Sequence, residues 1–214
     1  VALAPYALAI SAAAIFSVRL YDRLAPRRLG ILGFVLVAIG LTVVAFTIRN
    51  DWGTPVVILG LLVLGLGEGS LLTLLVNVLV SASRKELAGD VGALRGVIHA
   101  VSSALGTAVI GAVVVSLLSL FIVSAFRASD LPASLETEIN FDNINFVTND
   151  HLRAVLSATS ATPEQVEEAA RVNENARLLA LKASFLILAS LSLLAIFPAT
   201  GLPNYVAGEI PSEA

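Results

Sequence analysis

The sequence predicts an all-α fold, a polytopic bundle of transmembrane helices, and three observations lead to this fold class. Of the 214 residues, 57% are hydrophobic and only 14% are charged, whereas about a quarter of the residues in a soluble domain are charged. The mean hydropathy is +0.90. Because a bilayer core of about 30 Å requires roughly 20 apolar helical residues, we expect five spans, at residues 1–18, 29–48, 56–83, 96–126 and 178–202.

The first apolar stretch is interpreted as a true span. It has no basic leader and runs into an arginine-rich turn, whereas a secretory signal would run into a cleavage site. The chain contains no methionine, so we expect it to be a fragment of a longer protein.

The distribution of basic residues predicts the orientation of the spans, because short cytoplasmic loops carry an excess of Lys and Arg. Basic residues cluster in the connection after the first span and in the connection after the third span. We therefore expect both connections, and the tail at 203–214, to be cytoplasmic. The basic residues concerned are Arg19, Arg23, Arg27, Arg28, Arg84, Lys85 and Arg95.

The sequence predicts four regions: spans at 1–126, an insert at 127–177, a final span at 178–202 and the tail. The insert has four arginines against nine acidic residues and is expected to be extracytoplasmic. Asparagines interleaved with apolar residues at 140–149 indicate a short strand or an irregular lid. Thr162 and Gln165 have the spacing of a capping box, with Pro163 at the first helical position. We expect a helix to start there and to continue into the last span.

Glu68 is the strongest candidate for a functional residue. It lies near the centre of the third span, where a charged side chain costs about 2.5–3.5 kcal/mol on insertion scales. One interpretation is a carboxyl in a water-accessible cavity that exchanges a proton or pairs with a cationic substrate. The other is a neutral carboxyl that is hydrogen-bonded to a neighbouring helix.

Small residues indicate two places where helices approach closely. Gly65, Gly67 and Gly69 flank Glu68, and small residues four apart favour helix packing; a hinge in the helix is the alternative. In the fourth span, a stripe of small residues lies on one face and indicates a packing seam. A polar pathway is the alternative. The residues are Ser103, Thr107 and Gly111.

Three further cationic or titratable residues lie near the predicted membrane boundaries. Arg95 and His99 are four residues apart and share a helix face, so they are candidates for a proton pathway or for residues solvated at the interface. Lys182 lies one turn inside the last span, where its long side chain can extend to the interface.

The sequence provides no support for an enzyme, a metal site or a bound cofactor. It has no cysteine and only two histidines, and it lacks a phosphate loop, a Gly-x-Ser-x-Gly elbow and a His-Glu-x-x-His helix. The formal net charge of -3 argues against nucleic-acid binding, which depends largely on Lys and Arg.

The turn after the first span carries a family resemblance. Residues 19–28 resemble the Gly-x-Leu-x-Asp-Arg-x-Gly-x-Arg signature of the major facilitator superfamily. Asp22, Arg23 and Arg27 match the signature, whereas Val18 and Ala25 stand where the two glycines would be. The resemblance implies that the five spans are the last five helices of the C-terminal half of such a transporter.

Three other segments are similar to the fourteen-span drug/proton antiporter subfamily. They are the glycines at 65–69, the segment at 105–108 and the end of the chain at 202–211. The chain departs from that pattern at Gly96 and His99, where the subfamily tends to carry Asn and Arg, and at 102–103, where serines replace a glycine pair.

The resemblance implies a proton-coupled exporter of drugs or other amphipathic compounds that works by alternating access. Asp22, Arg23, Arg27 and Arg28 would form a cytoplasmic gate. The implied partners are the lipid bilayer, protons, a small-molecule substrate and a missing N-terminal half, in a bacterial inner or plasma membrane. A metabolite symporter or facilitator of the same fold and a non-transporting membrane scaffold remain alternatives.

Overall fold

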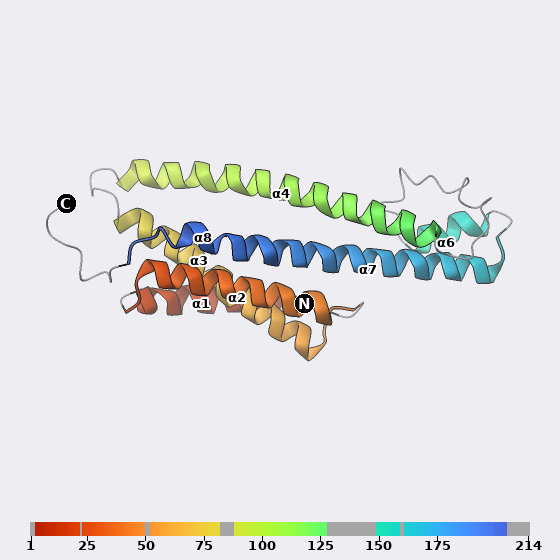
Figure 1. Cartoon of the computed structure of the whole chain (residues 1–214), viewed down its shortest axis with the longest axis horizontal. Coiled ribbons are helices and arrows are strands. Elements are labelled where there is room, and N and C mark those ends of the chain that lie inside the picture. Colours follow the sequence, from red (N-terminus) through yellow and green to blue (C-terminus); the bar gives the residue numbers. More distant parts are fainter. Residues whose placement is uncertain are drawn as a thin grey trace. The chain divides into compact units, whose positions relative to one another are not determined.

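The computed structural model describes residues 3–21, 23–49, 52–81, 88–127, 149–158 and 161–204. Within these ranges all regular structure is helical, as the sequence predicts. The helices are α1 (Ala4–Tyr21), α2 (Pro26–Thr47), α3 (Pro55–Ser81), α4 (Ala88–Arg127), α6 (Asn149–Ser157), α7 (Pro163–Leu194) and α8 (Ile196–Ala199) (Figure 1).

Five stretches of the described helices are long and apolar enough to cross a membrane, and the sequence predicts the same number of candidate spans. They are Ala4–Tyr21, Pro26–Thr47, Pro55–Ser81, Gly89–Ala125 and Pro163–Ala199.

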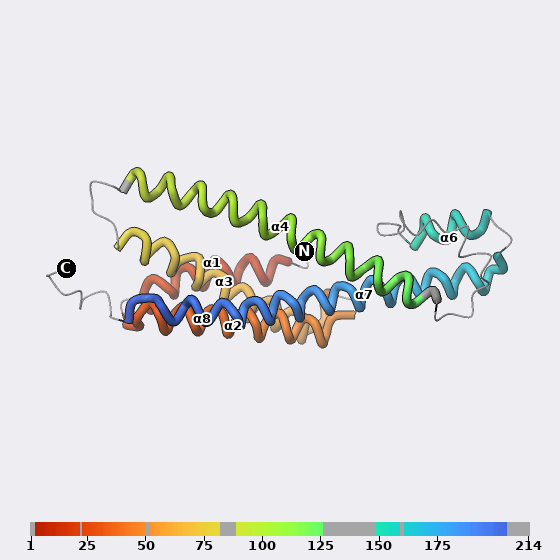
Figure 2. Tube along the Cα trace, turned by 45° about the horizontal axis from the view of Figure 1, so that its top comes forward, coloured from red at the N-terminus to blue at the C-terminus, as the bar shows by residue number. Residues whose placement is uncertain are grey.

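The chain divides into two compact units. The first comprises residues 1–104 together with 185–214, and its described part is built around α3, with α1 and α2 packed against it (Figures 1 and 2). Gly65 and Gly69 of α3 face α1, whereas Gly67, two residues along and so on the opposite side of the helix, faces α2. The side chains of α1 pair with α3 in increasing order along both helices, so these two helices run parallel.

The C-terminal end of the chain also packs into the first unit. The Ser192 hydroxyl donates a hydrogen bond to the Phe34 carbonyl at 2.9 Å, and the backbone N–H of Arg27 donates to the Pro203 carbonyl at 3.1 Å. Both contacts attach the last span to α2. Residues 202–204 therefore lie at the same end of the first unit as the start of α2.

The described part of the second unit, residues 105–184, is a cluster of α6 with parts of α4 and α7. Leu118 and Ile122 of α4 lie in its core beside Leu152 and Leu156 of α6, and α7 contributes Val166 and three alanines, Ala169, Ala176 and Ala180. The end of the predicted fourth span therefore packs against protein.

The lengths of α4 and α7 exceed what a bilayer requires. At 1.5 Å per residue, the 40 residues of α4 extend about 60 Å, twice the hydrocarbon thickness of about 30 Å. The first nine residues of α7 include Glu164, Glu167 and Glu168, and such charges exclude this end of the helix from hydrocarbon.

The structure modifies two predictions about the C-terminal third of the chain. Asn149 is the first residue of α6, not part of a strand or lid, while residues 140–148 lie outside the described residues. Lys182 lies within α7, as expected for a helix that continues from the insert into the last span. The last span is interrupted at Ala195 between α7 and α8, because Pro198 has no N–H to donate to the Leu194 carbonyl.

Candidate functional site

Glu68 lies in the middle of α3 and is half-buried. Its Oε2 accepts a hydrogen bond from the hydroxyl of Tyr6 on α1. The contact joins two helices across 62 positions of sequence and supplies one of the partners that an intramembrane carboxyl requires.

The glycines beside Glu68 explain why Tyr6 can reach it. A Cβ placed on Gly65 would lie 2.6 Å from the Tyr6 carbonyl oxygen, and one on Gly69 would lie 2.5 Å from the Ile10 carbonyl oxygen. Both distances are too short for any side chain, so the backbones of α1 and α3 approach as closely as they do only because these residues are glycines. The helix α3 continues through this segment without interruption.

A cavity of about 180 Å³ lies beside this contact. All of its lining side chains are aliphatic or aromatic, and the Tyr6 ring forms part of its wall. The other lining residues are Leu3, Leu41, Val44, Trp52, Leu61, Leu64 and Phe185. Tyr6 therefore belongs both to the cavity and, through its hydroxyl, to the polar contact with Glu68.

Two of the lining aromatic residues contact each other. The rings of Trp52, between α2 and α3, and Phe185, on α7, meet edge to face, with centroids 6.5 Å apart and an interplanar angle of 79°. This is a favourable arrangement for an aromatic pair. The cavity is thus bounded by α1, α2, α3, α7 and the turn that holds Trp52, all in the first unit.

Polar contacts continue along α1 and α3 beyond Glu68. Ser17 donates to Ser70 at 3.0 Å, and the hydroxyls of Tyr21 and Ser81 lie 3.5 Å apart. With the Tyr6–Glu68 contact, these pairs fix the register of the two helices at three levels.

The other residues predicted for a pathway are not near this contact. Arg95 and His99 are exposed on α4, and within the described part of the chain neither makes a hydrogen bond or an ion pair. Ser103, Thr107 and Gly111 are also exposed, and a Cβ on Gly111 would meet no described atom within 4 Å. Within the first unit, the structure brings neither Arg95 nor His99 nor Ser103 into contact with Glu68.

The predicted gate residues lie at the turn between α1 and α2. Arg23 and Arg28 are exposed, and Arg27 is half-buried. Asp22 lies outside the described residues.

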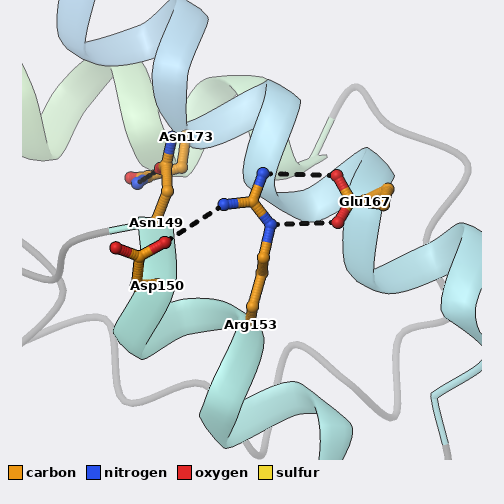
Figure 3. Close-up of polar contacts among 5 residues, drawn as sticks. All are labelled: Asn149, Asp150, Arg153, Glu167 and Asn173. Carbon is orange, nitrogen blue, oxygen red and sulfur yellow. Dashed lines mark hydrogen bonds and ion pairs between the residues drawn. The ribbon is translucent and has the colours of Figure 1, made fainter.

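A second polar cluster joins α6 to α7 (Figure 3). The Arg153 guanidinium donates to both carboxylate oxygens of Glu167, at 2.9 and 3.3 Å, and to Asp150 at 3.4 Å. The hydrogen bonds and the negative charge of Glu167 raise the pKa of Arg153 above its ordinary value. Asn173, fully buried, donates from Nδ2 to Asn149 Oδ1 at 2.7 Å.

This cluster has a structural role in the second unit. It attaches the polar side of α6 to α7, while Leu152 and Leu156 of α6 lie in the apolar core. The sequence analysis missed it, although apolar residues four apart in 152–156 are the signal of a helix with one buried face. In the ranges that the structure describes, no group of three His, Asp or Glu side chains is placed to hold a metal ion.

Comparison with known proteins adds no relative. No protein-family model matches the chain, and no match was found among the curated proteins or among the solved structures.

Proposed function

We propose that this chain is the C-terminal part of a proton-coupled transporter of the major facilitator superfamily that exports amphipathic compounds by alternating access. In this proposal Glu68 is the carboxyl that takes up and releases the proton. The C-terminal tail and the turn between α1 and α2 are cytoplasmic, and the insert at 127–177 is extracytoplasmic.

The observation that carries the proposal is the hydrogen bond between Glu68 and Tyr6, whose ring lines an apolar cavity. An ionisable group inside a membrane span is costly and is found most often on ion or substrate pathways. The Tyr6 hydroxyl supplies a hydrogen bond to the carboxyl, and the cavity beside it, lined by aliphatic and aromatic side chains, is suited to the apolar part of an amphipathic substrate.

The test is efflux of a fluorescent amphipathic cation, ethidium, from vesicles that contain equal amounts of each full-length variant under an imposed pH gradient. Glu68→Gln keeps the shape of the side chain and a hydrogen-bond acceptor but cannot titrate. We expect it to lower efflux at least about tenfold, as general acid–base groups contribute factors of about 10²–10⁴. Glu68→Asp, which still titrates, should retain partial activity.

Glu164→Gln is the matched control. Glu164 is exposed at the start of α7, and its replacement by Gln makes the same change in charge. It should transport at the wild-type rate. Wild-type efflux by Glu68→Gln would refute a proton-carrying role for this carboxyl. Proton-driven accumulation of a solute, with no export, would favour the alternative of a symporter.

The cytoplasmic gate is a separable part of the proposal. Asp22, Arg23, Arg27 and Arg28 would pair with charges on another part of the transporter. Asp22→Asn should leave insertion unchanged, because acidic residues contribute little to topology, and should slow transport. Transport at the wild-type rate would leave the arginines with a role in orientation only.

A further inference from the structure

The Tyr6 side chain is shared between the cavity and Glu68, and this arrangement has a consequence for binding. The ring is half-buried and forms one wall of the cavity, and its hydroxyl is held by the Glu68 carboxyl. The other walls include Leu41, Val44 and Leu61, which are buried in the packing between α2 and α3. Tyr6 is therefore a wall residue that a polar contact with Glu68 also holds.

The volume and lining of the cavity define the group that it can hold. This cavity is partly open, and at about 180 Å³ it is slightly larger than an apolar cavity of about 150 Å³ that binds benzene. It offers aliphatic and aromatic contacts, including the edge-to-face pair of Trp52 and Phe185, and no charged side chain lines it. These features select an uncharged ring and exclude a solvated polar group.

We propose that this cavity is a binding site for an uncharged, ring-sized aromatic group and that Tyr6 is the positioning residue that couples its occupancy to Glu68. The contact with the carboxyl holds the Tyr6 ring in place as a preformed wall. A ring bound in the cavity packs against Tyr6 and keeps its hydroxyl on the carboxyl. Binding of the ring and formation of the Tyr6–Glu68 hydrogen bond are thermodynamically linked. The factor by which a bound ring strengthens the hydrogen bond therefore equals the factor by which loss of the hydrogen bond weakens binding of the ring.

The binding site stands on the cavity and the contact alone, whereas its use in transport rests on the proposed function. An apolar ring of an amphipathic substrate would occupy the cavity, and Tyr6 would transmit its presence to the carboxyl that carries the proton. Binding and transport are measured separately below, so that failure of one is distinguishable from failure of the other.

Trp52 provides a direct readout, because it lines the cavity and is the one tryptophan in the sequence. The probe is bromobenzene, whose bromine quenches an indole on contact, titrated into full-length protein in detergent with the signal of Trp52→Phe subtracted. We expect saturable quenching. Quenching that rises linearly, without saturation, would overturn the proposed site.

A cavity-filling pair of variants shows whether the quenching comes from the cavity. Leu64→Phe places a larger side chain in the cavity and should weaken binding at least about tenfold, whereas Leu66→Phe makes the same change on an exposed position of α3 and should bind as the wild type does. If Leu64→Phe does not fold, Leu41→Phe and its exposed counterpart on α2, Leu32→Phe, provide the same comparison. Equal binding by a folded filled variant and its control would contradict the site.

The coupling is tested by removing only the hydroxyl. Tyr6→Phe keeps the ring and should weaken bromobenzene binding about tenfold, since it removes the hydrogen bond that holds the ring. Glu68→Leu, which removes the acceptor, should weaken it equally, and the double variant should be no weaker than either single variant. Glu68→Gln keeps an acceptor and should restore most of the affinity. Additive effects of Tyr6→Phe and Glu68→Leu would overturn the coupling.

A lipid acyl chain is the competing occupant, and a brominated phospholipid tests it. If the cavity holds a ring, bromine on the acyl chains should quench Trp52 equally in the wild type and in Leu64→Phe. Quenching by the lipid that Leu64→Phe abolishes would assign the cavity to lipid and refute the proposal.

Saturable bromobenzene binding together with wild-type efflux by Glu68→Gln would retain the site and refute only the proposed proton carrier.

Discussion

The carbonyl oxygen of Ile10 on α1 lies 2.5 Å from the position that a Cβ would take on Gly69 of α3. No side chain can be accommodated at that distance without a shift of one helix against the other. Because the Tyr6–Glu68 contact is formed one turn away between the same two helices, the close approach at Gly69 is a condition for the candidate site.

Gly69→Ala is therefore expected to destabilise the protein. Overpacking costs about 1–3 kcal/mol, against a gain of about 1 kcal/mol from replacing a helical glycine. The free energy of unfolding in detergent should fall, and bromobenzene binding should weaken with it, because α1 and Tyr6 move away from Glu68.

Gly106→Ala is the matched control, since a Cβ at Gly106 on α4 meets no described atom within 4 Å. It should leave stability unchanged or raise it by up to about 1 kcal/mol. If Gly69→Ala were as stable as Gly106→Ala, the packing of α1 on α3 would not be as close as the structure has it. A large loss of stability in Gly106→Ala would instead show that another helix covers this face of α4.

The local signal at Thr162, Pro163 and Gln165 correctly predicted a helix start, because proline and capping residues act within one turn of the chain. Proline also begins α2 and α3, at Pro26 and Pro55, although the predicted spans at 29–48 and 56–83 rested on apolar length alone. The reciprocal bonds of the capping box are formed: the Thr162 N–H donates to Gln165 Oε1 at 2.9 Å, and the Gln165 N–H donates to Thr162 Oγ1 at 3.3 Å. The prediction that α7 continues from this box into the last span is confirmed.

Thr162→Ala should lower the stability of the start of α7. Loss of the side-chain cap costs about 1 kcal/mol, within a range of about 0.5–2 kcal/mol. Amide hydrogen exchange of the first turn of α7 should accelerate accordingly. Thr162→Ser keeps the hydroxyl and should exchange as the wild type does; exchange that is unchanged in Thr162→Ala would show that the box does not stabilise this end.

The Arg153–Glu167 contact should make a small, salt-sensitive contribution to the attachment of α6. Arg153→Lys keeps the charge but loses the paired hydrogen bonds to the two carboxylate oxygens. Both side chains are partly exposed, so we expect exchange of the α6 amides to rise by no more than about fivefold. Arg177→Lys, an exposed arginine on α7, is the matched control and should have no effect. An equal rise in amide exchange in Arg177→Lys would show that replacing an arginine by lysine has this effect without any loss of the contact with Glu167.

The pH dependence of the same contact follows from the raised pKa of Arg153. A base whose pKa is raised on folding contributes its full stabilisation below the ordinary pKa and loses it only as the pH passes the raised value. For arginine that loss lies in the strongly alkaline range. After correction for the intrinsic exchange rate, protection of α6 should therefore stay constant between pH 7 and pH 10. A decline within that range would show that another group controls the attachment.

The contents of the candidate site were only partly predictable, because they depend on how separate helices align. Glu68 stands out from its charge and its glycines from their spacing, but neither indicates which helix lies opposite. Tyr6 and Trp52 become partners of this site only once the register of α1 on α3 is set by packing. The second unit was missed for a related reason: the apolar end of α4 reads equally well as membrane span or as the core of a helical cluster.

The last prediction concerns the orientation of the chain in the membrane. The Arg27–Pro203 hydrogen bond places the start of α2 and residue 204 at the same end of the first unit, so both must face the same compartment. The arginines around this turn predict that this end lies in the cytoplasm.

Because the sequence has no cysteine, single cysteines can be placed at Leu24, at Asn204 and at Ala154 on α6. An impermeant thiol reagent applied to intact cells should label Ala154→Cys and neither of the other two, and all three should react after the cells are opened. Labelling of Asn204→Cys and Leu24→Cys, with Ala154→Cys protected, would reverse the orientation. Labelling of only one of Leu24→Cys and Asn204→Cys would contradict the contact between α2 and the end of the last span.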